Sequence, residues 1–568
     1  MNARRNLDQP IEHKSVDYTP MNYGGMVYSK TAIVFDYLLA YLGDSLFDHC
    51  MHTYYDEWHF KHPGPNDLEV IFERETGKQL DWMFEDLIKT TKQIDFALTG
   101  FKKIDDKEHV VVLNKGDIKS PYNLTYFKEG KIVSDKWYDG ISMINYHLIN
   151  REEVDEVKID YQQDIPEIDR TNNTIRTKGI FKSSEPIKLQ WLGGIEDPNV
   201  NTLYYTPLGG WNKYDGLMLG FSFYNHTFPE KKFEYTLTPM FSFSTLSATG
   251  LGDLHYHFYP HDGNFIQRIT LGSEYQSFHF QNDASGKGRF HKLAPYAVID
   301  FQKKNRRSKW KQKAELNYNF ISNTYTYADA QLPGDYIQAL RVKYKITNSQ
   351  VLKPLSLKVE YEQGSVKNTV GNNQDYIKTS ITAKWRFNYN WNLDGVDIRL
   401  FAGHFFKNNT LSSRYNWQLD GQGGFNDYLY DHIFLGRMQG HPDALSQQMV
   451  ENHGAFKAPT GYGSSNSWLL AGNIGFDLPI RMLGLYADAG LFPVHNVSTG
   501  VIDARFVYNA GVHLAIKKGL IDVYIPLAIH QDILDEYDYN NITFLQRIRF
   551  TFNIKELNPF KLIKQIEP

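Results

Sequence analysis

The sequence predicts a mainly β, multidomain protein in which a small α-helical segment and a β-sandwich-like domain precede a transmembrane antiparallel β-barrel of about 16 strands. Three observations predict this fold class. The chain has 568 residues, which is too many for one hydrophobic core. Aromatic residues reach 15% although the mean hydropathy is only -0.48. The C-terminal two thirds alternate between apolar and polar residues, as barrel strands do when they separate lipid-facing from lumen-facing side chains.

The alternation is clearest over residues 377–389, where the apolar and aromatic side chains take odd positions and Lys, Ser, Thr, Arg and Asn take even ones. Polar or glycine-rich turns separate such segments, and their spacing gives about 16 strands because bacterial barrels prefer even numbers. The other segments with this pattern are 215–225, 233–244, 265–278, 309–320, 336–346, 355–362, 395–405, 467–477, 505–514 and 542–554.

A soluble β-sandwich or β-propeller would also alternate on one face. Two features favour the barrel. Large aromatic residues lie near the strand ends, as they do in membrane girdles, and the polar face carries charged or amide residues in nearly every segment, which suits a wet lumen. We therefore assign residues 191–568 to a bacterial outer-membrane barrel, with outer-membrane lipid as its partner.

Charge and cysteine content narrow the other possibilities. The 61 Lys and Arg against 65 Asp and Glu leave a net charge of -4, which gives no reason to bind nucleic acid. The single cysteine, Cys50, excludes an intramolecular disulfide.

Within the barrel, the long polar segment 438–467 is a candidate extracellular loop or lumen plug, and the alternative is a loop without a special role. It contains His441, Pro442, Asp443 and the glycines 461 and 463.

In residues 1–93, apolar residues recur at helical spacing and not at every second position as they do in the barrel segments. Apolar residues predict a helix over 34–42 that ends at Gly43, a second helix from Asp44 to about Trp58, a third from Asn66 to Gly77, and a fourth over 80–87. This unit is too small to be stable alone. Residues 94–190 follow as a β-sandwich-like domain and linker, with strand-like runs at 109–113 and 123–127.

The helical segment resembles a known family. The runs Tyr-Ser-Lys-Thr-Ala at 28–32, Leu-Gly-Asp at 42–44, Trp-His-Phe-Lys-His-Pro at 58–63, Glu-Thr-Gly at 75–77 and Leu-Asp-Trp-Met-Phe at 80–84 are similar in order and spacing to the part after the zinc site of gluzincin metallopeptidases of the aminopeptidase N and leukotriene-hydrolase family. The β domain that follows is similar to the sandwich present in some members.

The resemblance implies roles for two residues. In that family a tyrosine in a Tyr-x-Lys-Gly-like motif stabilises the oxyanion of the tetrahedral intermediate; Tyr28 matches the tyrosine and Lys30 its motif neighbour, while Thr31 replaces the glycine. A placed phenol donor suits this chemistry, since negative charge develops when zinc-bound water attacks a peptide carbonyl. The alternative is an ordinary tyrosine at a helix start.

The zinc ligands of that family are missing from this sequence. No His-Glu-x-x-His motif occurs in the 568 residues, although two imidazoles and a carboxylate are needed to bind the metal. We assign no metal site here: His49 and His52 share a helical face, and His59 and His62 follow, but without a carboxylate in register.

Residues 421–424 are predicted to form a turn and not a nucleotide-binding loop. Because no signal sequence is evident either, we expect the C-terminal part of a longer exported protein, with zinc and a peptide substrate belonging to the full-length form.

Two functions follow from these observations. The first is the C-terminal portion of a membrane-anchored zinc-dependent aminopeptidase, inactive as this chain alone and with its substrate-binding residues unknown. The second is a non-enzymatic outer-membrane barrel, either a pore or a surface anchor, that retains a remnant of a peptidase.

Overall fold

A computed structural model describes residues 2–260, 264–327, 330–367, 372–391, 393–437, 444–480, 482–495, 502–517 and 519–553. The chain divides into two compact units. The N-terminal unit holds residues up to 203 together with 227–230, and the barrel unit holds 204–226 and the residues from 231 onward. Each unit is described separately below.

The N-terminal unit begins with helices. Gly43 and Gly77 have positive φ angles of 80° and 65°, a conformation in which a side chain is strained, so both residues end helices as predicted. The third helix starts one residue earlier than the predicted Asn66, at Pro65, and the backbone N–H of Gly64 donates to Asp67 Oδ2 at 2.7 Å, which caps it. The elements are η1 (Ala3–Arg5), η2 (Ser15–Asp17), α1 (Pro20–Gly24), π-helix η3 (Gly25–Lys30), α2 (Thr31–Leu42), α3 (Asp44–Trp58), α4 (Pro65–Thr76) and π-helix η4 (Trp82–Ile88).

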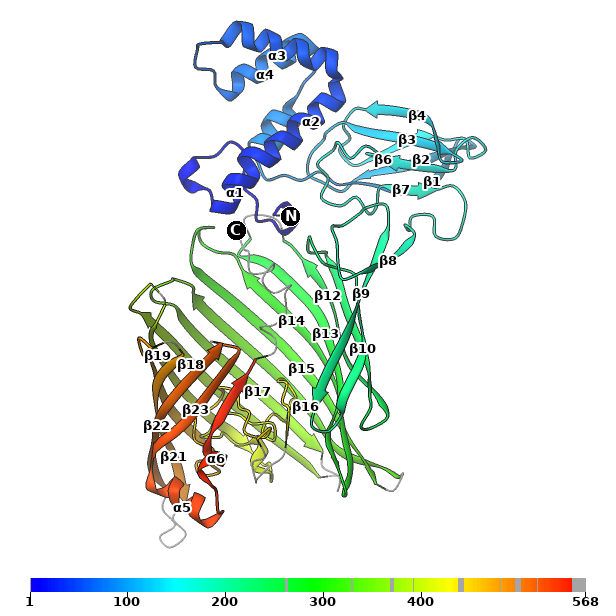
Figure 1. Cartoon of the computed structure of the whole chain (residues 1–568). Helices are drawn as coiled ribbons and strands as arrows, with labels where there is room; N and C mark the ends of the chain where they lie inside the picture. The colour runs from blue at the N-terminus through cyan, green and yellow to red at the C-terminus, as the bar shows by residue number, and fades with distance from the viewer. Residues whose placement is uncertain are drawn as a thin grey trace. The chain divides into compact units, whose positions relative to one another are not determined.

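Two small antiparallel sheets complete the N-terminal unit. Their orders are β1-β2-β5 and β4-β3-β6-β7, and Figure 1 shows them in cyan. Helices and sheets share one core, in which Tyr37 and Trp82 pack with Phe96 and Tyr122. The strands are β1 (Phe96–Ile104), β2 (Lys107–Asn114), β3 (Tyr122–Lys128), β4 (Lys131–Tyr138), β5 (Ile144–Leu148), β6 (Glu156–Ile159) and β7 (Thr174–Arg176).

Among the helices of the described residues, none has the length and apolar character needed to cross a membrane.

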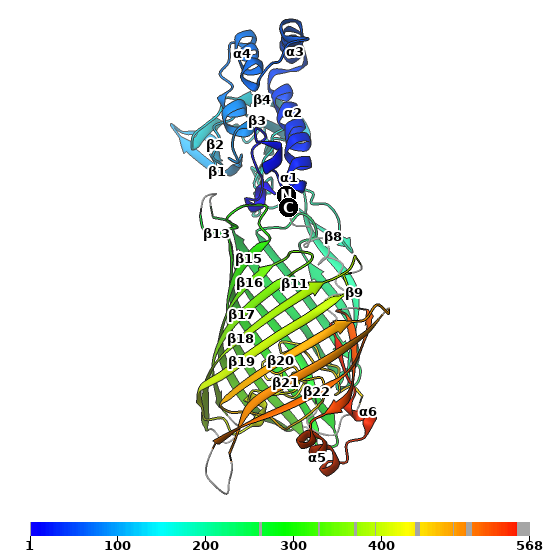
Figure 2. The same cartoon turned by 90° about the vertical axis from the view of Figure 1, so that its left-hand side faces the viewer.

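The remaining strands form one closed barrel, in which consecutive strands from β9 to β24 pair antiparallel. Seventeen strands of the described residues take part, in the order β10 to β24 followed by β8 and β9; neighbouring strands lie side by side in Figure 2. The strands are β8 (Ile187–Trp191), β9 (Asn201–Asn212), β10 (Gly216–Tyr224), β11 (Phe233–Ser242), β12 (Ser247–Phe258), β13 (Ile266–Asp283), β14 (Gly286–Phe301), β15 (Trp310–Tyr327), β16 (Ala330–Asn348), β17 (Leu355–Lys367), β18 (Asn373–Asn388), β19 (Gly395–Asn408), β20 (Trp468–Asp477), β21 (Leu483–His495), β22 (Ile502–Lys517), β23 (Ile521–Ile529) and β24 (Arg549–Phe552).

The two faces of the barrel wall differ as the alternation predicts. On β12, Leu254, Tyr256 and Phe258 are exposed on the outer face, while His255 and His257 on the inner face are largely covered. A closed sheet with an apolar outer face is compatible with a lipid bilayer, because closure leaves no unpaired backbone N–H or C=O group facing lipid. The predicted mainly β fold with an antiparallel transmembrane barrel is confirmed.

The C-terminal segment differs from the expected strand over 542–554. Helix α5 (Gln531–Tyr539) and helix α6 (Phe544–Arg547) come first, and only β24 pairs with β23. The Thr543 N–H donates to Gln546 Oε1 at 2.8 Å, a capping box that starts α6. This local cap outweighs the alternating pattern.

A buried carboxylate lies at the end of β6 in the N-terminal unit. Asp160 accepts the backbone N–H of Ile165 at 3.0 Å and the Nε–H of Arg170 at 3.2 Å. Burial raises the pKa of Asp160 to about 6, although the charge of Arg170 opposes that shift. In the unfolded chain an aspartate returns to its ordinary value near 3.8.

Because the folded pKa of Asp160 is raised, protonation stabilises the native unit fully below about pH 4, and this contribution is lost as the pH rises towards 6. A shift of this size corresponds to about 3 kcal/mol. We expect amide-exchange protection of β6 in the full chain to fall between pH 4 and 6.5, and Asp160→Asn to flatten that dependence. Parallel pH profiles for the two proteins would contradict the assignment.

Candidate functional site: a plug inside the barrel

The connection between β19 and β20 folds inside the barrel. We name residues 409–467 the plug; the structure describes 409–437 and 444–467 of it, and Figure 1 shows its yellow trace within the ring of strands. The segment predicted as a loop or plug, 438–467, is its second half, and the predicted His441, Pro442 and Asp443 lie outside the described residues. The first half was not predicted.

The strongest contact of the plug with the wall is an ion-pair cluster. The Asp431 carboxylate lies 2.7 Å from Lys292 Nζ on β14 and also pairs with the guanidinium of Arg341 on β16. Lys292 is only 2% exposed. A buried ammonium that lost its carboxylate would be strongly destabilised, so Asp431 holds this part of the plug against two strands.

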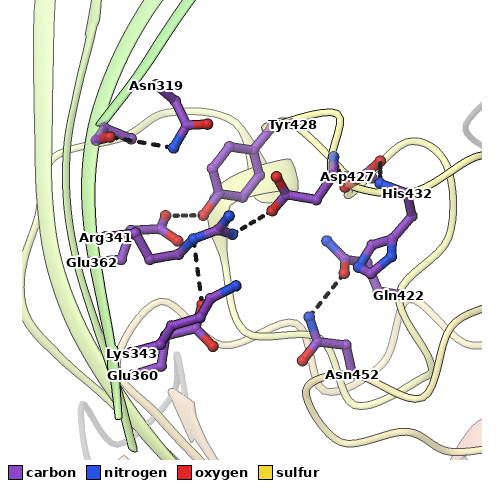
Figure 3. Close-up of polar contacts among 12 residues, drawn as sticks. Asn319, Arg341, Lys343, Glu360, Glu362, Gln422, Asp427, Tyr428, His432 and Asn452 are labelled. Atoms are coloured by element: carbon purple, nitrogen blue, oxygen red, sulfur yellow. Dashed lines mark hydrogen bonds and ion pairs between the residues drawn. The ribbon is translucent and has the colours of Figure 1, made fainter. Parts of the chain in front are cut away.

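Tyrosine hydroxyls add a second set of contacts. Glu362 on β17 accepts hydrogen bonds from Tyr428 of the plug and, at 2.8 Å, from Tyr376 on β18; Figure 3 shows Tyr428 facing Glu362 from the plug side. Tyr430 stacks on Phe290 of β14 with ring centroids 3.7 Å apart. Tyr428 and Tyr430 therefore combine the apolar contact of a ring with a hydrogen-bonded hydroxyl.

The other side of the plug contacts strands further around the barrel. Arg399 on β19 donates to the carbonyl of His453 at 2.7 Å. The backbone N–H of Lys457 donates to Asp488 on β21 at 2.9 Å, and Arg549 on β24 lies 3.0 Å from Asp420. Together with the contacts to β14, β16 and β17, these bonds fix the plug from several directions.

Internal hydrogen bonds give the plug its own shape. Asp427 accepts the backbone N–H groups of Asp431 at 3.1 Å and His432 at 3.2 Å, and its carboxylate lies 3.0 Å from Arg437. The Arg437 backbone N–H in turn donates to Tyr214 Oη at 2.6 Å. The turn that presents Tyr428 and Asp431 to the wall is thereby preorganised.

Little space remains between the plug and the wall at the charged contacts. A cavity of about 40 Å³ is lined there by Arg341, Glu360 and Glu362 from the wall and by Asp427, Tyr428 and Asp431 from the plug. That volume suits one or a few water molecules. The geometry provides fixed charge and hydrogen bonding, and no space for a substrate at this point.

The residues singled out from the family resemblance lie in the N-terminal unit. Tyr28 lies in η3 and is 65% exposed. Lys30 points elsewhere, with Nζ 3.6 Å from Asp8 Oδ2 and 3.5 Å from the carbonyl of Thr90. Burial lowers the pKa of Lys30, and Asp8 opposes that shift. The two motif residues therefore do not meet, and Lys30 has a local structural contact.

The remaining candidates take ordinary positions. Cys50 is buried in the core of the N-terminal unit. His49 Nε2 pairs at 3.0 Å with Glu75, a carboxylate from α4 that the sequence spacing did not predict as a neighbour. His59 Nδ1 donates to the backbone carbonyls of Tyr55 and Asp56 in α3, at 2.9 and 3.1 Å. The glycine-rich run 421–424 belongs to the plug, where the Gly421 N–H donates to the Phe456 carbonyl at 3.0 Å.

Comparison with known proteins gives structural likeness only. No family model matches the chain, and no curated protein does. Similar solved structures include CdiB from Acinetobacter baumannii (9% identity, TM-score 0.30, covering 78% of this chain and 62% of that one), BamA from Haemophilus ducreyi lacking POTRA domains 1–3 (12%, 0.32, 58% and 69%) and CdiB from Escherichia coli (11%, 0.30, 62% and 65%).

The chain therefore spans less than two thirds of both CdiB structures. Likeness of this degree transfers no function. The chain's own closed antiparallel barrel, with its apolar outer face, defines the class: this is a bacterial outer-membrane β-barrel protein.

Asp431 gives a direct test of the plug contacts. Asp431→Asn leaves Lys292 buried without this carboxylate and leaves Arg341 with the more distant Glu360, at 3.7 Å. We expect this change to cost about 3–5 kcal/mol and to release protection of residues 420–437 in amide hydrogen exchange. The matched control is Asp375→Asn, which breaks an exposed pair with Lys407 at 3.2 Å and should cost under about 1 kcal/mol. Equal effects of the two variants would contradict a special role for Asp431.

Proposed function

We propose that this chain is a non-enzymatic outer-membrane barrel that acts as a surface anchor, with the plug keeping its lumen closed to steady ion flow. The observation that carries the proposal is the set of buried ion pairs and hydrogen bonds between plug and wall, above all those of Asp431 and Glu362. The anchored load is the N-terminal unit, which is covalently continuous with the barrel.

The alternative of an open pore fits these contacts less well. Barrels of 16 to 18 strands leave an aqueous channel when nothing fills them, and here charged plug residues are already paired with the wall. A pore for ions benefits from unpaired charge along its path, whereas Asp431 pairs with both Lys292 and Arg341, and Arg341 also lies 3.7 Å from Glu360.

Planar-bilayer recording tests the anchor against the pore. The full chain should show little steady conductance. A variant in which residues 412–464 are replaced by a short Gly-Ser linker should conduct strongly, because β19 and β20 are antiparallel neighbours, paired at His404 and Trp468, and a short loop can join them.

The control replaces only the exposed contact, with Asp375→Asn in the complete chain, and should stay as silent as the parent. A large steady current through the parent protein would favour a pore. A linker variant that folds but stays silent would show that something other than the plug closes the lumen.

A second candidate function is the C-terminal portion of a zinc-dependent peptidase. The observation that favours it is the exposed phenol of Tyr28, a position from which a hydroxyl could reach an oxyanion. In this proposal the metal, which activates water for attack on the peptide bond, and the residues that bind the peptide are supplied by chain outside the present sequence, and the barrel anchors the enzyme.

The peptidase proposal makes a negative and a positive prediction. The present chain should show no turnover of a fluorogenic aminoacyl substrate, whereas the native protein isolated from outer membranes should be heavier than 66.0 kDa and lose most of its activity in Tyr28→Phe with little change in KM. Turnover by the 568-residue chain would contradict the proposal that the metal and the peptide-binding residues lie outside it. A native species of 66.0 kDa would exclude this function.

A further inference from the structure

Three histidines and a glutamate lie close together on the inner side of the barrel, on strands β11 and β12 and the connection after β10. Glu234 on β11 lies directly opposite His255 on β12 in the strand register. His257 follows two residues later, so period two places it on the same face. His226 comes from the connection that follows β10. All four residues belong to the barrel unit.

The donor atoms of Glu234, His255 and His257 are grouped closely enough to share one metal ion, and His226 approaches the same carboxylate. His255 Nε2 lies 3.3 Å from Glu234 Oε2, and His226 Nε2 lies 3.6 Å from the same oxygen. One donor atom each of Glu234, His255 and His257 fall within 4.8 Å of one another. Two ligands of a tetrahedral zinc ion, with bonds of about 2.0–2.1 Å, are separated by about 3.3 Å, close to the two nitrogen-to-oxygen distances measured here.

The opposite nitrogens of the imidazole rings are engaged in the manner of metal-binding histidines. His255 Nδ1 lies 2.5 Å from Asp253 Oδ1, and His257 Nδ1 lies 2.9 Å from Thr270 Oγ1. Such partners fix the tautomer so that Nε2 faces the metal. Tyr296 Oη donates to Asp253 Oδ2 at 2.9 Å, which orients that carboxylate in turn.

Backbone elements hold the carboxylate and make room for these partners. The Lys231 N–H donates to Glu234 Oε1 at 2.9 Å, leaving Oε2 towards the imidazoles, and Glu234 is 0% exposed. Gly272 allows the ring of Tyr296 to approach, because a Cβ there would lie 2.5 Å from the ring. A fully covered carboxylate among three imidazoles is the donor set that Zn²⁺ prefers.

We propose that Glu234, His255, His257 and His226 bind one structural Zn²⁺ that ties the β10–β11 connection to β12. Glu234, His255 and His257 supply the three donors already grouped together, and His226, 3.6 Å from the same carboxylate, completes the set in this proposal. With four protein donors no position would remain for a substrate or reactive water, which distinguishes a structural from a catalytic site. The proposal departs from the expectation of no metal in this chain, and it is independent of the anchor and peptidase proposals because it concerns other residues.

Metal binding to the full chain in detergent tests the site. After chelator treatment, the parent should take up one Zn²⁺ per chain in equilibrium titration with a competing chelator, and Co²⁺ in its place should give the intense visible absorption of four-coordinate cobalt. His257→Ala and Glu234→Gln should lose stoichiometric binding. Asp253→Asn, which removes only the partner of His255, should weaken binding about 10–100-fold.

Two controls separate this site from other histidines. His279→Ala removes another covered imidazole, 2.7 Å from Asp215, and should leave binding unchanged, as should the double variant His49→Ala/His52→Ala in the N-terminal unit. Heat-dependent migration in electrophoresis verifies that each barrel is folded. The proposal is overturned if the parent takes up no stoichiometric Zn²⁺, or if His279→Ala loses as much binding as His257→Ala.

Discussion

Closure of the strand ladder is the constraint on which the barrel depends. In a membrane no water is present to satisfy the N–H and C=O groups of an edge strand, so the sheet must return to its first strands; here the order runs from β10 to β24 and back through β8 and β9. Closure fixes the inside and outside of every strand. Each outward residue is thereby committed to lipid and each inward one to the lumen, which is why Leu254 and His255 are adjacent in sequence and opposite in environment.

The same closure creates the problem that the plug solves. A ring of this many strands encloses more space than its own side chains fill, and the inward residues are polar. Charged groups such as Lys292 and Arg341 need partners when water is excluded. The plug supplies one through Asp431, and it packs Tyr428 and Tyr430 against the wall beside it. The barrel and the plug are therefore expected to fold together, because the charged groups of the inner wall and those of the plug are each other's partners.

The barrel strands and the helices could be predicted from the sequence, because both repeat apolar residues at a regular spacing. Strict alternation over 377–389 is visible because one face is uniformly apolar, and Gly43 and Gly77 mark helix ends because only glycine adopts those angles easily. The plug has no period. Residues 409–437 gave no prediction beyond a turn at 421–424, since a segment that binds a polar wall has the same composition as one that binds water. Helix α6 was missed because the alternating pattern is broken only at Leu545 and Gln546 and resumes on both sides of them, so a short helix there was read as part of a strand.

The metal-binding cluster illustrates a different limit. Zinc motifs are recognised by helical spacing, as in the expected His-Glu-x-x-His, or by short cysteine pairs. On a strand the equivalent spacing is His-x-His, present at His255 and His257, and it carries no information until the register is known. Glu234, 21 residues earlier, becomes a neighbour only because the β11–β12 ladder pairs it with His255. Sites built across strands are thus determined by register, and in a closed barrel register is itself determined by the requirement that the sheet closes.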